Sequence, residues 1–93
     1  MATKILIPTP LRAYTDKRDS VLAEGNTVGE LLEHLAVHHT ALRRHLFSDD
    51  GKLRAFVNVY VNNEDIRYLQ KEKTPVKAAD TVSIIPSIAG GTQ

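Results

Sequence analysis

The sequence predicts an α+β domain in which a mixed sheet of four to five strands packs on one main helix. The prediction rests on a strand-like run near each end of the chain, an alternating strand at residues 56–62, and one amphipathic helical pattern beginning at residue 27. A single amphipathic helix needs one apolar surface to cover, and one face of a sheet supplies it. The length of 93 residues suits one domain.

The N-terminal segment predicts a hairpin with a long loop. Residues 4–8 form an apolar strand pattern that Pro8 ends, because proline has no backbone N–H to donate. Residues 11–18 are polar and loop-like. Residues 20–23 form the second strand pattern, and Glu24-Gly25-Asn26 is a typical turn sequence.

The main helix is predicted to begin after Thr27. Thr27 and Glu30 have the spacing of a capping box, in which a hydroxyl and a carboxylate satisfy the first free N–H groups. An apolar stripe follows with helical periodicity, at Val28, Leu31, Leu32 and Leu35. The helix is expected to end near His38 or His39. Leu42 and Leu46 then indicate a short second helical segment.

Residues 56–62 give the clearest strand pattern, because they are rich in β-branched and aromatic side chains that alternate. Alternation puts three valines on one face, which we expect to be the core: Val57, Val59 and Val61. The opposite face then carries Phe56, Asn58, Tyr60 and Asn62.

After this strand, residues 63–65 are expected to turn, and Ile66, Tyr68 and Leu69 to pack in an irregular or short helical segment. Residues 74–76 fit a short strand, and residues 81–85 form the last strand, with Val82 and Ile84 on one face. The resulting order, β-β-α-β-(short β)-β, is that of a ubiquitin-like β-grasp. In that fold the first and last strands lie side by side at the centre of the sheet.

Composition narrows the possible functions. The formal net charge is +1 with acidic and basic residues interspersed, so nucleic acid and anionic membrane are not indicated as partners. The absence of cysteine excludes disulfides, a thiol nucleophile and thiolate-held iron–sulfur clusters. The longest apolar runs are too short to span a bilayer and no signal peptide is visible, so a cytoplasmic location is expected.

The last residues, Ala89-Gly90-Gly91-Thr92-Gln93, suggest a chemically active terminus. We expect residues 1–86 to form the domain and residues 87–93 to form a flexible tail. Glycine has no Cβ, so a tail with Ala89, Gly90 and Gly91 can thread into a narrow active site. While Thr92-Gln93 remains attached, Gly91 has a peptide carbonyl rather than a free carboxylate.

Three stretches resemble the MoaD/ThiS family of ubiquitin-like sulfur-carrier proteins, and the similarity runs through the whole domain. These are residues 7–12, Ile-Pro-Thr-Pro-Leu-Arg; residues 56–67, Phe-Val-Asn-Val-Tyr-Val-Asn-Asn-Glu-Asp-Ile-Arg; and residues 82–91, Val-Ser-Ile-Ile-Pro-Ser-Ile-Ala-Gly-Gly. Within the family the chain looks closest to the CysO type, which supplies sulfide for cysteine synthesis.

The resemblance implies that the protein is not an enzyme but a co-substrate, with no cofactor of its own. A ubiquitin-activating-enzyme-like adenylyltransferase would use ATP to adenylate the Gly91 carboxylate, and a sulfur donor would convert it to a thiocarboxylate. A PLP-dependent cysteine synthase, or another acceptor enzyme, would receive the sulfide. Because the simplest family pattern ends at Gly-Gly, a JAMM-type zinc peptidase would first cut between Gly91 and Thr92.

The outer strand face suggests where a partner docks. Phe56, Tyr60 and Ile85 are expected to form an exposed apolar patch beside the tail, suited to the adenylyltransferase. His34 and His38 have the i, i+4 spacing of metal ligands, but no third ligand is placed, so no metal site is expected. No catalytic triad or phosphate-binding loop is visible.

Three alternatives remain open from the sequence. The sulfur could serve thiamin, molybdopterin or another sulfur-containing metabolite. The chain could be a ubiquitin-like protein modifier, since joining Gly91 to lysines begins with the same adenylate. It could also be a β-grasp interaction domain that binds without covalent chemistry.

Overall fold

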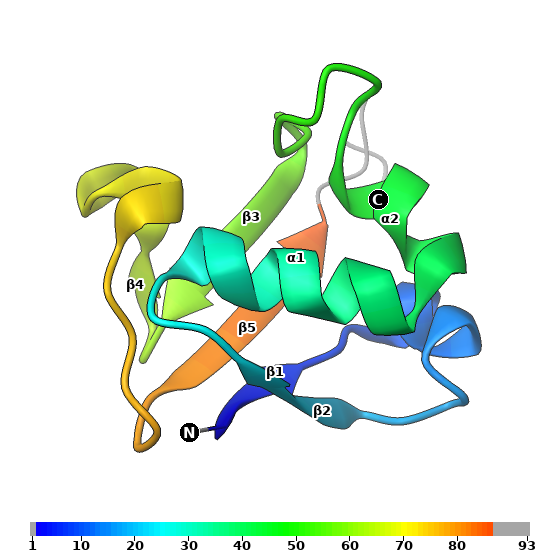
Figure 1. Cartoon of the computed structure of the whole chain (residues 1–93), viewed down its shortest axis with the longest axis horizontal. Coiled ribbons are helices and arrows are strands. Elements are labelled where there is room, and N and C mark those ends of the chain that lie inside the picture. The colour runs from blue at the N-terminus through cyan, green and yellow to red at the C-terminus, as the bar shows by residue number, and fades with distance from the viewer. Residues whose placement is uncertain (1, 87–93) are drawn as a thin grey trace.

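In the computed structural model, which describes residues 2–86, a five-stranded sheet has the order β2-β1-β5-β3-β4 and α1 lies across one of its faces (Figure 1). The strands are β1 (Ala2–Leu6), β2 (Ser20–Glu24), β3 (Val57–Val61), β4 (Glu64–Asp65) and β5 (Thr81–Pro86). The α-helices of this part of the chain are α1 (Val28–His38) and α2 (Thr40–Leu46), and its 3₁₀ helices are η1 (Thr9–Tyr14), η2 (Ile66–Tyr68) and η3 (Lys71–Lys73).

The sheet is mixed, as the sequence predicts. The first and last strands, β1 and β5, are parallel neighbours, and Ile5 lies opposite Val82. The other pairs, β1–β2, β3–β5 and β3–β4, are antiparallel. This arrangement confirms the β-grasp order and places β5 in the middle of the sheet.

The core lies between the sheet and α1, and the predicted faces are correct. Val57, Val59 and Val61 of β3 are buried, with 6%, 1% and 7% of their surface exposed. The apolar stripe of α1 packs against them and is equally buried. Leu42 and Leu46 of α2 are fully buried, so the second helix also contributes to the core.

The start of α1 follows the capping signal with one difference. The Thr27 hydroxyl accepts the N–H of Glu30 at 3.2 Å, as expected for an N-cap. The Glu30 carboxylate, however, accepts the N–H of Asn26 at 2.8 Å, one residue before the cap. The two bonds together hold the turn that leads from β2 into α1.

The short strand was predicted at the wrong place. Residues 63–65 were expected to turn, yet Glu64 and Asp65 form β4 and pair with Val61 and Tyr60. Asn62 and Asn63 make the tight connection, with φ of 50° and 76°. A two-residue hairpin needs positive φ at both central positions, and asparagine tolerates it.

Residues 74–76 do not form the predicted strand. Pro75 makes only an isolated bridge with Thr27, while the N–H of Val76 donates to the carbonyl of Asn26 at 3.0 Å. The segment therefore ties down the start of α1 and adds nothing to the sheet.

Two smaller expectations were also wrong. The loop predicted at residues 11–18 begins instead inside η1, where Leu11 is buried against the core. Ile66 packs as predicted, but Tyr68 is 85% exposed and Leu69 is 38% exposed. The short helix η2 buries only its first residue. The apolar residues of this segment therefore predicted more buried side chains than the structure has.

Candidate functional site

The candidate site is the end of β5 together with the sheet face that surrounds it. β5 lies between β1 and β3, and its last residue, Pro86, is opposite Val57. Residue 87 therefore follows directly on a strand that is paired on both sides. The predicted site residues Ala89, Gly90, Gly91 and Thr92 lie outside the described residues.

The face of the sheet away from α1 is called the outer face here. Strand pairing defines its members, since residues directly opposite each other point to the same side. Ser83 of β5 lies opposite both Leu6 of β1 and Tyr60 of β3. Ile85 is two residues further along β5, and side chains two apart share a face.

The outer face carries an apolar patch around Ser83, made by Leu6, Tyr60 and Ile85. Ile85 is 49% exposed, Leu6 is 38% exposed, and Tyr60 is partly buried. These side chains come from three adjacent strands, so the sheet itself holds them in place. Exposed apolar side chains gathered on a rigid surface are typical of docking sites.

The predicted docking residues are only partly brought together. Tyr60 and Ile85 lie on the outer face as expected. Phe56 is 43% exposed but precedes β3, in the turn where the Arg54 guanidinium lies 6.0 Å from its ring centre. Leu6 was missed, although its place between the buried Ile5 and Ile7 was a signal that it points outward.

An ion pair borders the patch on the β4 side. Asp65 lies opposite Tyr60, and its carboxylate accepts bonds from Nε and Nη2 of Arg67, the latter at 2.7 Å. It also accepts the backbone N–H of Arg67 at 2.9 Å. These bonds favour the ionised carboxylate and lower the pKa of Asp65, and the same pairing raises the pKa of Arg67.

His34 and His38 on α1 make hydrogen bonds to the backbone of the domain. Nδ1 of His34 accepts the backbone N–H of Glu24 at 2.8 Å, and Nδ1 of His38 bonds the carbonyl of His34 at 3.0 Å. Within residues 2–86, no group of three or more His, Cys, Asp or Glu side chains is placed to hold a metal ion. Over the same residues, no helix is long and apolar enough to cross a membrane.

A family model described as the ThiS family matches residues 5–91. The chain belongs to the ThiS family. The match includes the Gly90-Gly91 pair and stops before Thr92. The outer face and β5 are therefore parts of a ThiS-family domain that covers nearly all of this sequence.

Two curated relatives that match nearly the whole chain are named as sulfur carriers. The sulfur carrier protein CysO of Mycobacterium tuberculosis is 39% identical over 93 residues, which cover 98% of this chain and all of the relative. A putative sulfur carrier protein of Archaeoglobus fulgidus is 32% identical over 91 residues, with 98% and 100% covered. Both similarities are in agreement with a CysO-like sulfur carrier.

A solved structure of similar shape confirms the ubiquitin-like β-grasp. The crystal structure of the Amycolatopsis orientalis BexX/CysO complex matches with a TM-score of 0.86 and 40% identity. The match covers 97% of this chain and 100% of the solved chain. The likeness thus extends from the sheet to both helices.

Proposed function

We propose that this protein carries sulfur as a thiocarboxylate on Gly91 and donates it, as sulfide, in cysteine biosynthesis. The observation that carries the proposal is the ThiS-family match, which runs through the domain and stops at Gly91. The described residues end at Pro86 of β5, a central strand of the sheet, five positions before Gly91 in the sequence. The similarity to proteins named CysO supports the choice of cysteine as the product.

The chemistry requires a free carboxylate at Gly91. A zinc peptidase of the JAMM type would hydrolyse the bond between Gly91 and Thr92 and release Thr-Gln. An adenylyltransferase would then join the Gly91 carboxylate to the α-phosphate of ATP and release pyrophosphate. A sulfur donor would attack the acyl carbon, AMP would leave, and one carboxylate oxygen would be replaced by sulfur.

The carrier contributes recognition in this scheme, and the partner enzymes contribute catalysis. The apolar patch of Leu6, Tyr60 and Ile85 would dock the adenylyltransferase. Docking there leaves the end of β5 directed at the partner, because Ile85 is next to the last residue of that strand. The acceptor would be an activated serine held by a PLP-dependent synthase. The BexX/CysO complex of Amycolatopsis orientalis supports partner binding by a carrier of this kind.

Intact mass spectrometry tests the proposal. A chain ending at Gly91 is incubated with the adenylyltransferase, ATP and a sulfide source. We expect a product in which one oxygen is replaced by sulfur. The full-length chain should remain unchanged in the same mixture, because Gly91 then has no free carboxylate. Failure of the shortened chain to gain sulfur would overturn the proposal.

A modifier function would start from the same adenylate, so a second readout is needed. The protein is recovered from its own cells and examined on a denaturing gel under non-reducing conditions. A sulfur carrier runs at its own mass. Conjugates of higher mass that disappear in a Gly91→Ala variant would point to a protein modifier instead.

A further inference from the structure

Arg67 uses one edge of its guanidinium within the fold and leaves another edge free. Nε and Nη2 donate to the carboxylate of Asp65, at 3.1 Å and 2.7 Å. Nη1 makes no hydrogen bond or ion pair with any residue from 2 to 86. The side chain of Arg67 is 60% exposed, whereas that of Asp65 is 8% exposed. The edge formed by Nη1 and Nη2 is therefore accessible to a group from another molecule.

Two tyrosines accompany this guanidinium. Tyr60 and Tyr68 line an open hollow of about 480 Å³ together with Arg67. Both are close enough to interact with the guanidinium electrostatically. Tyr60 belongs to the apolar patch of the outer face, and Tyr68 is 85% exposed. Tyrosine and arginine are the residue types that often dominate the binding energy of protein interfaces, and a tyrosine hydroxyl can also donate to an anion.

Two carboxylates line the same hollow, and they differ in what they bind. The Asp65 carboxylate already holds Nε, Nη2 and the backbone N–H of Arg67. Glu64 is exposed and forms no ion pair with any residue in the described part of the chain. Asp65 is thus neutralised by its partner, and Glu64 is a nearby competitor for the free edge of Arg67.

We propose that the Nη1–Nη2 edge of Arg67 binds an aspartate or glutamate side chain of the adenylyltransferase when that enzyme docks on the outer face. The inference rests on the proposed function and adds the chemistry of the partner surface, a carboxylate beside an apolar contact. A guanidinium can bind two carboxylates, because each of two edges offers a pair of N–H donors. Asp65 occupies the first edge and fixes the plane of the group, so binding at the second edge immobilises little that is not already ordered.

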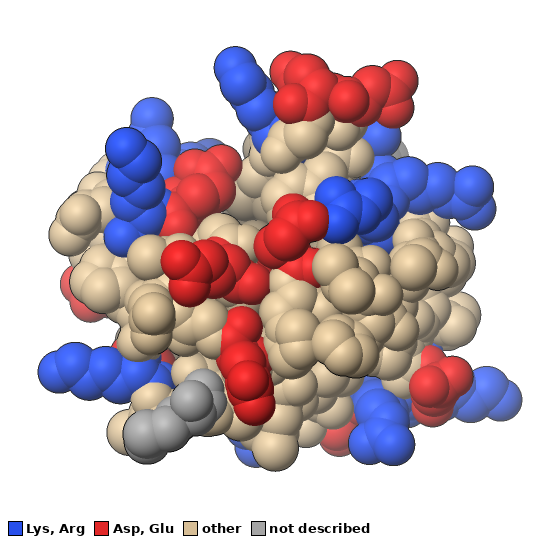
Figure 2. Space-filling model, in the orientation of Figure 1, with Lys and Arg blue, Asp and Glu red and all other residues tan. Residues whose placement is uncertain are grey.

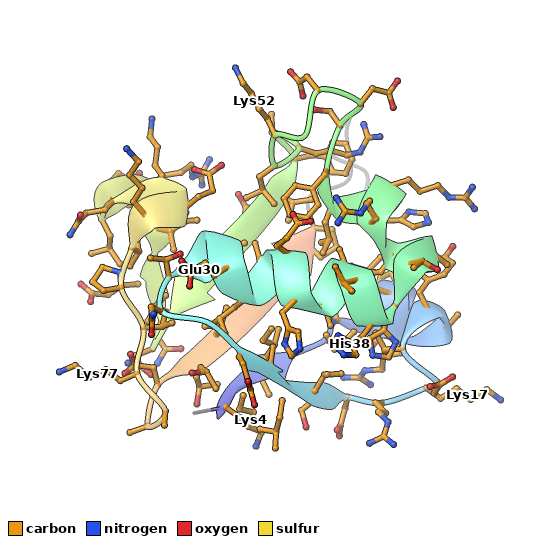
Figure 3. All side chains as sticks on the ribbon, viewed as in Figure 1. Lys4, Lys17, Glu30, His38, Lys52 and Lys77 are labelled. Carbon is orange, nitrogen blue, oxygen red and sulfur yellow. The ribbon has the colours of Figure 1, made fainter. Side chains whose placement is uncertain are left out.

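The distribution of charge favours the outer face for an acidic partner. Figure 2 shows acidic side chains across the middle of the face that α1 covers, and Figure 3 shows Glu30 there, in the first turn of α1. Like charges that meet across an interface weaken binding. Among the described strand residues of the outer face, the acidic ones are Glu24 and Asp65. Glu24 is on β2, at the opposite edge of the sheet from Arg67, and Asp65 is already paired.

Steady-state kinetics of the adenylyltransferase test the inference, with the chain ending at Gly91 as the varied substrate and ATP consumption as the readout. Arg67→Lys keeps a positive charge beside Asp65 but has no planar pair of donors, so the KM for the carrier should rise about tenfold. The kcat should change little, because Arg67 is outside the reacting tail. Arg67→Gln also removes the charge, and the KM of this variant should rise less steeply with added salt than that of the wild type.

Three further variants serve as controls. Arg44→Gln removes the same charge from an exposed arginine on α2, outside the outer face, and should leave the KM unchanged. Glu64→Gln removes the competing carboxylate and should lower the KM about twofold. Arg67→Gln leaves the buried Asp65 carboxylate without its partner, so the double variant Asp65→Asn/Arg67→Gln provides the same test if the single variant fails to fold.

The outcomes separate this inference from the proposed function. A rise in KM confined to the Arg67 variants supports the inference. If Arg67→Lys has the wild-type KM while Ile85→Asp raises it, the enzyme docks on the outer face without Arg67, and the inference alone is overturned. An equal rise in Arg44→Gln would also overturn it, because the effect would then follow net charge. If the wild-type chain ending at Gly91 is not a substrate at all, the proposed function fails and the inference fails with it.

Discussion

At the scale of single residues, the Asp65–Arg67 ion pair lies at the end of β4, beside Tyr60 of the outer face. Asp65 is 8% exposed, and its carboxylate holds both the N–H and the guanidinium of Arg67. The carboxylate also caps η2, the short helix that follows β4. One side chain thus fixes the direction in which the chain leaves the hairpin.

The lowered pKa of Asp65 predicts a loss of stability in acid. A carboxylate whose folded pKa lies below its unfolded value of about 3.9 contributes its full stabilisation above that value. The contribution is lost as the pH falls through the folded pKa. Asp65→Asn should therefore lower the urea midpoint of unfolding at pH 7, and the difference from wild type should shrink toward pH 2. A difference that stays constant with pH would contradict this account.

At the scale of elements, α1 depends on its first turn. The Thr27 hydroxyl satisfies the N–H of Glu30, which has no partner inside the helix. Thr27→Ala should lower the free energy of unfolding by about 1 kcal/mol, the usual cost of losing an N-cap. Urea denaturation measures the change. Thr27→Ser keeps the hydroxyl and should cost clearly less, whereas equal losses would show that the cap bond contributes little.

The inner face of β3 predicts a larger effect. Val59 is 1% exposed and is part of the core between the sheet and α1. Val59→Asp would bury an unpaired carboxylate, which costs several kcal/mol and should unfold a domain of this size. Circular dichroism and thermal melting follow the loss. Ile85→Asp, on the opposite face of the neighbouring strand, should remain folded because Ile85 is half exposed.

The elements that could be predicted from sequence are those whose apolar residues follow one period. The helix pattern after Thr27 and the alternation of residues 57–61 both gave correct faces. β4 was missed because two positive φ angles at Asn62 and Asn63 make a hairpin within a polar run. η1 was missed because a single buried side chain, Leu11, anchors it. Neither feature produces a periodic signal.

At the scale of the whole molecule, the two sheet faces have different roles. One face is sealed by α1 and contains the core, whereas the outer face leaves Leu6 and Ile85 exposed beside the end of β5. Alternation along β3 and β5 was enough to predict Tyr60 and Ile85 on that face. Leu6 was not predicted in the patch, because the β-grasp order makes β1 and β5 neighbours but does not give the register that places Leu6 opposite Ser83.

The outer face gives the last prediction. If Leu6, Tyr60 and Ile85 dock the adenylyltransferase, Ile85→Asp should raise the KM for the carrier at least tenfold, since a charge would be buried in an apolar contact. The kcat should change little, because Ile85 is outside the reacting tail. ATP consumption by the enzyme, measured with the chain ending at Gly91, gives both constants.

Val37→Asp is the matched control for this prediction. Val37 is an aliphatic residue that is 58% exposed, close to the 49% of Ile85, but it lies on α1, which covers the other face of the sheet. The two variants therefore add the same charge at similar exposure on opposite sides of the domain. Equal KM values for both variants would remove the outer face from the docking site, whereas a rise confined to Ile85→Asp would assign it.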